Sequence, residues 1–421
     1  MYKYFSKPIK FFIVLNIALY LFFTNCTNTA KKVEISIESE EGIKVIDIMG
    51  GLSENQKINL STVASGIEYC VLETNEKCLV SDQMNFYCTK DYIVTIGMAG
   101  SNDVSYVFER KTGNFVRQIS RYGQGSGEYT ETISSFWDGD NEQICLWGNM
   151  QYQFYNLDGT LSHKARRFKH SINNFISYND FYVGFVSNPF GNSKTRIAFY
   201  DKTGVLFDSI PEYRTWSRTQ SWYAGSIDGW IYLFRNDLFY KDIYCDTVYQ
   251  IKDFTLLPRY VFDTGGKTIP YKIQEGGRYD FIASLSNNGI AVDRYENYIY
   301  LLKIFESDKH LYFLVDYRLF EYPVLYDKAE GTVQIMPPVP IPPMKGRDWK
   351  IPLCGFENDL DGGLPFWPKQ MVSDREMMQV YTAEELLELD SLKITDKKLK
   401  HVLNRLEIDS NPVVAIVTLK D

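Results

Sequence analysis

The clearest candidate for a polar binding site is a glycine-rich segment from Arg121 to Tyr129, with the sequence Arg-Tyr-Gly-Gln-Gly-Ser-Gly-Glu-Tyr. Alternating glycines let successive backbone N–H groups point inward and let the chain approach a partner closely. The side chains that could contact a polar ligand are Arg121, Gln124, Glu128 and Tyr129. The segment could instead be a connector in which Glu128 and Tyr129 bond neighbouring backbone. It is not a phosphate loop, because no Lys-Ser/Thr pair and no helix start follow it.

Other signatures of catalysis or metal binding are sparse. The chain has four histidines, none in a paired ligand spacing, which argues against a zinc site. Two acidic stretches, Asp138 to Glu142 and Glu357 to Gly362, crowd oxygen ligands but lack the alternating set of a calcium loop, so we interpret them as solvated turns. There is no Gly-x-Ser-x-Gly elbow. The sequence therefore predicts no metal and no cofactor, and it leaves any catalytic residue unknown.

The N-terminus predicts the compartment. Three lysines precede an apolar stretch from Phe11 to Phe23, and Cys26 follows it. The stretch is shorter than the ~20 residues that a membrane-spanning helix needs, so residues 1–25 are typical of a signal peptide. The segment resembles the lipobox of bacterial lipoproteins, which would make Cys26 the lipidated first residue and 26–32 a tether. Asn25 departs from the usual small residue, and an ordinary secretory signal with a chance cysteine stays open.

Because Thr27 rather than Asp follows the cysteine, we expect the outer membrane rather than the inner one. The formal net charge is −8, and loss of the signal peptide's lysines makes it more negative. An acidic chain repels nucleic acid, so none is expected as a partner. The basic cluster at Lys164, Arg166, Arg167 and Lys169 is interpreted as a solvated strand edge.

Six cysteines follow Cys26, none in a Cys-x-x-Cys pair. We expect them to be mostly reduced and buried. One local alternative stays open, a bridge from Cys70 or Cys78 to Cys88.

A repeated turn motif predicts the fold. Strand-like residues and a tight turn end in glycine at four places, and the first three glycines are 46 and 45 residues apart. They are Gly113, Gly159, Gly204 and Gly331. This interval is typical of propeller blades with four strands each. Plain hairpins of any all-β protein are the alternative.

The intervals divide residues 33–421 into an all-β, six-bladed β-propeller domain. The expected blades are 79–119, 135–167, 175–210, 222–251, a fifth with an insertion between 264 and 284, and a sixth near the C-terminus. The proline-rich stretch 336–349 is expected to be an extended connector. Two short helices, near 382–389 and 397–406, should interrupt the last blade. The final strand at 412–419 should pair with an N-terminal strand and close the ring.

Several longer segments together carry a family resemblance. They are Ile67-Glu-Tyr-Cys-Val-Leu-Glu-Thr74, Gly113-Asn-Phe-Val-Arg-Gln-Ile119 with the glycine-rich segment after it, Asp246-Thr-Val-Tyr-Gln-Ile251 with Pro258-Arg-Tyr260, and Asn411-Pro-Val413. In these the chain resembles the six-bladed β-propeller lipoproteins of Bacteroidota, and its Gly-Gln-Gly-x-Gly-Glu-Tyr element is shared in looser form with NHL-repeat propellers. Ser126 stands where that family commonly has proline. Most members have no known function, so the resemblance implies fold and location but little chemistry.

Two functions are compatible with these features. The first is an outer-membrane-anchored lipoprotein, expected to be monomeric, whose propeller binds or scaffolds a glycan, a peptide or a partner protein; abundant Tyr and Trp suit such contacts. The alternative is a lyase or hydrolase with its site at the central channel. Scarce histidine favours the first.

Overall fold

The computed structural model describes residues 42–81, 84–97, 105–119, 123, 125, 128, 134–148, 151–170, 172–186, 188, 191–215, 229–271, 297–301, 303–341, 352–390 and 394–420. Residues Ser39–Asp421 form one compact unit. The predicted signal peptide, the lipidation site Cys26 and the tether lie outside the described residues. Within the described part of the chain, no helix is long and apolar enough to cross a bilayer.

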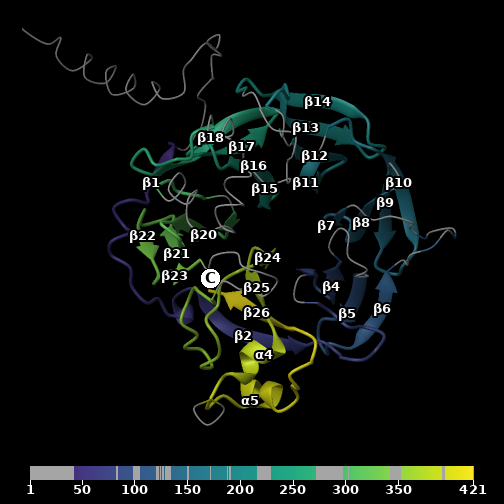
Figure 1. The fold of residues 1–421 in the computed structure, drawn as a ribbon, viewed down its shortest axis with the longest axis vertical. Helices are drawn as coiled ribbons and strands as arrows, with labels where there is room; N and C mark the ends of the chain where they lie inside the picture. Colours follow the sequence, from purple (N-terminus) through teal and green to yellow (C-terminus); the bar gives the residue numbers. More distant parts are fainter. Residues whose placement is uncertain are drawn as a thin grey trace, which may run out of the picture. The chain divides into compact units, whose positions relative to one another are not determined.

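The described strands form six small sheets arranged in a ring, so the predicted six-bladed propeller is confirmed (Figure 1). In the first three blades the strands follow one another from the axis to the rim. Blade one holds β3 (Asn85–Cys88), β4 (Tyr92–Ile96), β5 (Ser105–Glu109) and β6 (Phe115–Ile119). Blade two holds β7 (Ser134–Asp138), β8 (Gln143–Gly148), β9 (Gln151–Asn156) and β10 (Leu161–Arg166). Blade three holds β11 (Ile172–Tyr178), β12 (Phe181–Val186), β13 (Thr195–Asp201) and β14 (Leu206–Pro211).

The other three blades carry additions. Blade four holds β15 (Gly229–Phe234), β16 (Asp237–Asp242), β17 (Thr247–Lys252), β18 (Thr255–Asp263) and β1 (Lys44–Asp47). Blade five holds β19 (Ile304–Glu306), β20 (His310–Tyr317), β21 (Phe320–Asp327), β22 (Val333–Ile335) and β23 (Val339–Pro340). Blade six holds β24 (Gln370–Ser373), β25 (Glu376–Tyr381), β26 (Val413–Leu419) and β2 (Ala64–Val71), with the 3-10 turn η1 (Leu60–Thr62) before β2.

The ring is closed by a strand from each end of the chain, as predicted. β26 pairs antiparallel with β2, from Ala64 opposite Leu419 to Val71 opposite Val413. Neighbouring blades contact one another through β3 and β24, β24 and β19, β19 and β15, β15 and β11, and β11 and β7, while β7 contacts β4. Each blade therefore has a neighbour on both sides.

The apolar core is divided among the seams between blades. Six hydrophobic clusters account for the six seams, and each draws its residues from two adjacent blades. At the seam of blades three and four, for example, Val183 and Ile197 pack with Ile231 and Leu238. A blade buries its apolar faces only against its neighbours, as expected for a repeat architecture.

Two boundaries differ from the sequence prediction. Blade four does not end at Ile251 but continues through β18, and β1 adds a fifth, parallel strand to it. Pro258 is compatible with the sheet because it lies at a register shift in an outer strand, where a missing N–H is tolerated. The proline-rich connector contributes one short pairing, Val339 and Pro340 against the start of β21.

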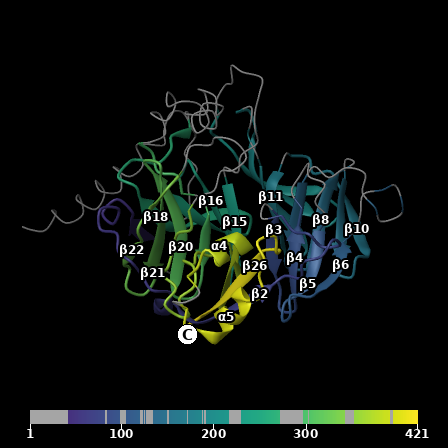
Figure 2. The same ribbon diagram turned by 60° about the horizontal axis from the view of Figure 1, so that its bottom comes forward.

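The local turn and helix predictions are confirmed. All four repeat glycines have positive φ, and at Gly113 a side chain is excluded because a Cβ would lie 1.9 Å from the Val71 carbonyl oxygen. The helix α4 (Ala383–Leu387) begins with the predicted capping box of Thr382 and Glu385. The helix α5 (Lys397–Leu403) contacts β2 at the rim (Figure 2).

The cysteines after Cys26 are free thiols, so the possible bridge to Cys88 is not formed. Four are buried, whereas Cys245 and Cys354 are only half-buried. Burial raises the pKa of Cys70 to about 12 and that of Cys88 to about 11. Such thiols are inert near neutral pH.

Two of the turn glycines allow the contact between the blade-one turn and blade six to be tested. Gly113→Ala should destabilise the protein more than Gly331→Ala, although both glycines have similar φ, 78° and 69°. Both variants bear the left-handed cost of about 1–2 kcal/mol, but only the Cβ at 113 meets the backbone of blade six, whereas the Cβ at 331 has open space. Denaturant unfolding of the two variants measures the difference. Equal losses would show that the turn of blade one does not constrain the closing strand.

Candidate functional site

The two faces of the ring differ in how they connect strands. On one, here called the hairpin face, tight turns join the first strand of a blade to the second and the third to the fourth, as at Asn179–Asp180 and 202–205. Strands alternate in direction, so blade-to-blade connections lie on the opposite face, here called the connection face. Three of these run from Ile119 to Ser134, from Pro211 to Gly229 and from Asp263 to Ile304. The connection face is where long segments can carry binding residues.

The predicted glycine-rich site belongs to the connection between β6 and β7. Of its four proposed ligand residues, only Glu128 is among the described residues; Arg121, Gln124 and Tyr129 are not. The Glu128 carboxylate accepts a hydrogen bond from the Gly125 N–H at 2.8 Å, and its own N–H donates to the Gly125 carbonyl at 3.1 Å. Glu128 thus occupies the inside of the glycine turn. Its role in ligand binding stays a prediction.

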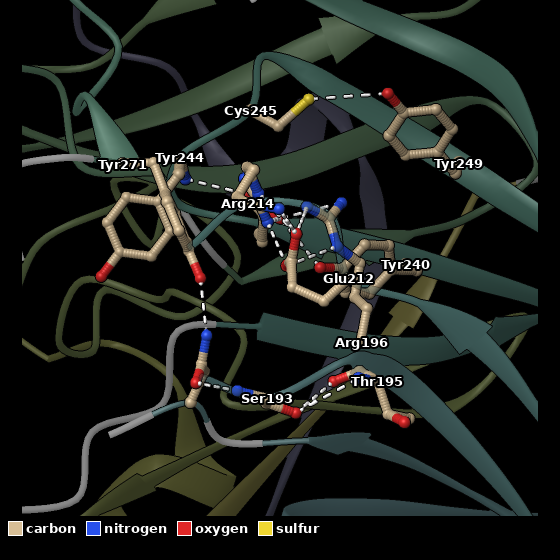
Figure 3. A network of polar contacts seen from close by, with 12 residues as sticks. Ser193, Thr195, Arg196, Glu212, Arg214, Tyr240, Tyr244, Cys245, Tyr249 and Tyr271 are labelled. Atoms are coloured by element: carbon tan, nitrogen blue, oxygen red, sulfur yellow. Dashed lines mark hydrogen bonds and ion pairs between the residues drawn. The ribbon is translucent and has the colours of Figure 1, made fainter. Parts of the chain in front are cut away.

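A network of buried charges lies at the connection face between blades three and four (Figure 3). Its members, here called the seam network, are Arg196 in β13, Glu212 and Arg214 after β14, and Asp242 at the end of β16. The Arg196 guanidinium lies 3.1 Å from Glu212 and 3.3 Å from Asp242. The Arg214 guanidinium lies 3.0 Å from Glu212 and 2.8 Å from Asp242. Each carboxylate therefore bridges both arginines.

The charges of the seam network compensate one another. Burial alone would lower the pKa of Arg196, but Tyr240, Asp242 and Glu212 together raise it well above its ordinary value. Burial raises the pKa of Glu212, and Arg196 only partly offsets this. Tyr240 donates its hydroxyl to Asp242 at 2.9 Å. Because a buried charge is tolerated only when paired and hydrogen-bonded, the network mainly fixes the two blades together.

Arg214 is the most exposed member of the network, with 27% of its side chain accessible. Its guanidinium carbon lies 4.3 Å from the centre of the Tyr271 ring, a cation–π contact. Asn188 donates to the Tyr271 hydroxyl at 2.9 Å, which fixes the ring. Tyr271 meets Tyr244 edge to face, with ring centres 5.2 Å apart. The seam network thus leads into a row of aromatic rings.

This row, here called the aromatic strip, covers the connection-face end of blade four. It consists of Trp230, Tyr244, Tyr271, Tyr298 and Tyr300, all partly exposed. Four of the rings, those of Trp230, Tyr244, Tyr298 and Tyr300, pack against the buried pair Ile243 and Ile269. The Trp230 indole N–H is buried and has no hydrogen-bond partner among the described residues. Partly exposed aromatic rings held by packing and hydrogen bonds are suited to contacting a ligand.

A second charged group lies at the other end of the strip, where blades four and five meet. The Lys303 ammonium lies 5.4 Å from the Trp230 ring centre. Asp316 and Glu321 face each other across β20 and β21, and the Cys354 thiol donates to Glu321 at 3.5 Å. The two acidic residues Asp316 and Glu321, together with the nearby Lys303, are here called the carboxylate group. Like charges directly opposite on paired strands are unfavourable.

The carboxylate group titrates abnormally. Burial, with repulsion from Glu321, raises the pKa of Asp316 well above its usual value. Burial also raises the pKa of Glu321 and lowers that of Lys303. Lys303 is nevertheless exposed, and both carboxyls are only partly buried. Perturbed pKa values accompany function in many proteins.

The acidic stretches and histidines fall elsewhere. Asp138 is fully buried, so its interpretation as part of a solvated turn was wrong: its carboxylate accepts hydrogen bonds from the Asn141 N–H and side-chain amide. His163 stacks on Phe154 and bonds the Tyr182 hydroxyl, and burial lowers its pKa. Within the described ranges no three His, Cys, Asp or Glu side chains are placed to hold a metal ion. The basic cluster lies exposed along and after β10, the outer edge of blade two, as expected.

Sequence reasoning missed the seam network, the aromatic strip and the carboxylate group. Their residues come from strand ends that are far apart in the chain and meet only when the blades are side by side. One signal was available: Lys241 and Asp242 interrupt an otherwise apolar and aromatic run at the end of β16. Both side chains are almost wholly buried, which marks a polar group recruited into a seam.

The carboxylate group gives a pH-dependent prediction. The pKa of Asp316 is raised in the folded state, so its ionisation opposes folding above its usual range near ~4. Asp316→Asn should therefore raise the free energy of unfolding at pH 7. The advantage should shrink as the pH falls toward 4, because the wild-type carboxyl becomes protonated. Urea unfolding at several pH values measures this, with the exposed Asp374→Asn as control. A pH-independent difference would contradict the assignment.

Solved structures with the same architecture come from Bacteroides. A protein of Bacteroides fragilis named as exported is 20% identical, with 90% of this chain and 100% of that chain covered and a TM-score of 0.62. A member of the DUF4221 family from Bacteroides vulgatus is 11% identical, with 85% and 97% covered and a TM-score of 0.51. At these identities the likeness shows the fold alone. No curated protein matches the chain. The model of a domain of unknown function, DUF4934, matches residues 43–418, almost the whole ring, and the chain therefore belongs to the DUF4934 family.

Proposed function

We propose that this protein is an outer-membrane lipoprotein whose propeller is a binding or scaffolding module for a glycan, a peptide or a partner protein. The proposed anchor is lipid attached to Cys26, since basic residues, a short apolar stretch and a cysteine follow one another at the N-terminus. A solved propeller of similar fold is named as an exported protein, which agrees with an envelope location.

The observation that carries the binding proposal is the aromatic strip with a charged group at each end. Aromatic rings offer apolar contact area at low conformational cost, and the Tyr271 hydroxyl is already bound within the protein. Arg214 at one end and Lys303 at the other could pair with acidic groups, while Asp316 and Glu321 could accept hydrogen bonds. Such a surface suits an extended, polar ligand that lies across blade four.

The glycine-rich segment is proposed as a second contact. The connection between β6 and β7 belongs to the same face as the aromatic strip. In this proposal Arg121, Gln124, Glu128 and Tyr129 contact a ligand or partner that extends across the ring. The Glu128 hydrogen bond to Gly125 holds the turn in shape.

The carboxylate group favours one alternative, a lyase or hydrolase. A carboxyl whose pKa is raised toward neutrality can act as a general acid or base. Lys303 directly precedes β19, the innermost strand of blade five, so it is the member of the group nearest the ring axis, while Asp316 and Glu321 lie on the next two strands. Turnover of a bound glycan or peptide that is lost in Asp316→Asn and Glu321→Gln, with binding retained, would establish this alternative.

A screen of glycans and peptides against the mature protein tests the binding proposal. Tyr271→Ala and Arg214→Ala should each weaken binding about tenfold, because they remove the stacked ring and its cation. The matched control is Arg235→Ala, an exposed arginine on the hairpin face that pairs with Asp308. The double variant Arg121→Ala with Gln124→Ala tests the glycine-rich segment in the same assay. Unchanged affinity in all of these variants would remove the connection face as the binding surface.

The anchor is tested separately. Cys26→Ser should abolish incorporation of labelled fatty acid and release the protein from the membrane fraction, because lipid at this cysteine is the proposed attachment. Cell fractionation with Cys88→Ser as control, a buried thiol of the ring, distinguishes lipidation from misfolding. Retention of the Cys26→Ser protein in the membrane fraction would contradict the anchor.

A further inference from the structure

A group of four aromatic side chains, two of them exposed and one, Phe199, buried, lies on the hairpin face at the seam of blades three and four. It consists of Phe181, Phe199, Phe207 and Phe254, here called the phenylalanine patch. Each ring contacts the other three, with centres 4.9–6.4 Å apart. Phe207 and Phe254 are 49% and 39% exposed, and Val205 beside Phe207 in the chain is 43% exposed. The patch is distinct from the aromatic strip, which belongs to the opposite face.

Phe254 is held in a conformation that a bulky residue seldom adopts. It forms the turn between β17 and β18 with Asp253, and the two residues have φ of 59° and 48°. Turns of this kind favour Asn and Gly at both positions, because a side chain with positive φ is crowded. An exposed phenylalanine here therefore bears a steric cost and leaves an apolar ring in water. A backbone outlier of this kind is a reason to look for a function.

The first described strand, β1, runs in the direction that leads away from the hairpin face. β1 runs parallel to β18, with Lys44 opposite Tyr260, and β18 begins directly after the Phe254 turn. Gly42 and Ile43, the described residues before β1, therefore lie on the side of Lys44 that faces the hairpin-face end of β18. The chain between Cys26 and Lys44 can span at most about 60 Å when extended. A lipid at Cys26 would keep the phenylalanine patch within reach of the bilayer.

We propose that the phenylalanine patch is a lipid contact that inserts Phe207 and Phe254 into the membrane interface. This inference rests on the proposed anchor, which would hold the ring near the bilayer at high effective concentration. The patch would then set the orientation of the ring. With the hairpin face on the lipid, the aromatic strip on the connection face points away from the membrane, where a ligand can reach it.

A new tryptophan in the patch reports its depth. Phe254→Trp is introduced in the full chain, which is placed on phosphatidylcholine vesicles whose acyl chains carry bromine, a short-range quencher. The added fluorescence, relative to wild type, should fall by about half, as for rings buried at the acyl boundary. Phe207→Trp provides a second position if the turn does not tolerate the larger ring.

The matched control is Ile408→Trp, because Ile408 is 74% exposed. It lies between α5 and β26, and β26 begins on the connection face. Its added fluorescence should be unchanged by bromine. Equal quenching at 254 and 408, or none at 254 and 207, overturns the proposal and would leave the patch for a protein partner. Quenching at 254 in protein that proves unlipidated would keep the lipid contact and reject the anchor, so the two failures are distinguishable.

Discussion

The fold depends on closing the ring between β2 and β26. Each blade buries its apolar faces only against two neighbours, so an open ring would expose the faces of two terminal blades. In β26 the side chains of Val413, Val414 and Val417 are fully buried. Burial of each of these side chains contributes about 1.5–3 kcal/mol, which is offset by the entropy lost in ordering the chain. The pairing joins residues about 350 positions apart in sequence, and such distant contacts form slowly because the intervening loop must close first.

Polar groups buried in the seams make the interfaces between blades chemically different from one another. The hydroxyl of Tyr182 in blade three bonds His163 of blade two, and the hydroxyls of Tyr232 and Tyr260 in blade four bond Glu306 of blade five. Glu306 is paired in turn with Lys328 at 2.6 Å. A buried polar group without its partner is costly, so blades packed in another order would leave these groups unsatisfied. The apolar clusters hold neighbouring blades together, and the tyrosine hydrogen bonds determine which blades fit against each other at these seams.

The sequence predicts what local chemistry determines. Gly113, Gly159 and Gly204 identified three blades, because a tight turn imposes its conformation on the residue at its end. The capping box at Thr382 was found for the same reason. Blade four was predicted to end at Ile251, whereas the positions of β18 and β1 near the rim are set only by assembly. Arg196, Glu212 and Asp242 could not be brought together from sequence, because their contact follows from the packing of two blades. Asp138 looked solvated for the same reason: the residues after it in the turn are exposed, but its own side chain is buried by the assembled blades.

The two faces of the ring are free to differ because they are under different constraints. A hairpin turn must match the twist and spacing of two paired strands, so its length is fixed and its few residues are held tightly, even at positive φ as in Arg235 and Asn236. A connection between blades is fixed by the strands only at its two ends, and lengthening it adds closure entropy only slowly. Ligand contacts can therefore vary on the connection face without disturbing the blades. The seam network fits this division: its buried ion pairs hold Arg214 in place at the rim of a seam, so that a side chain that would otherwise be mobile is presented beside Tyr271 in one orientation.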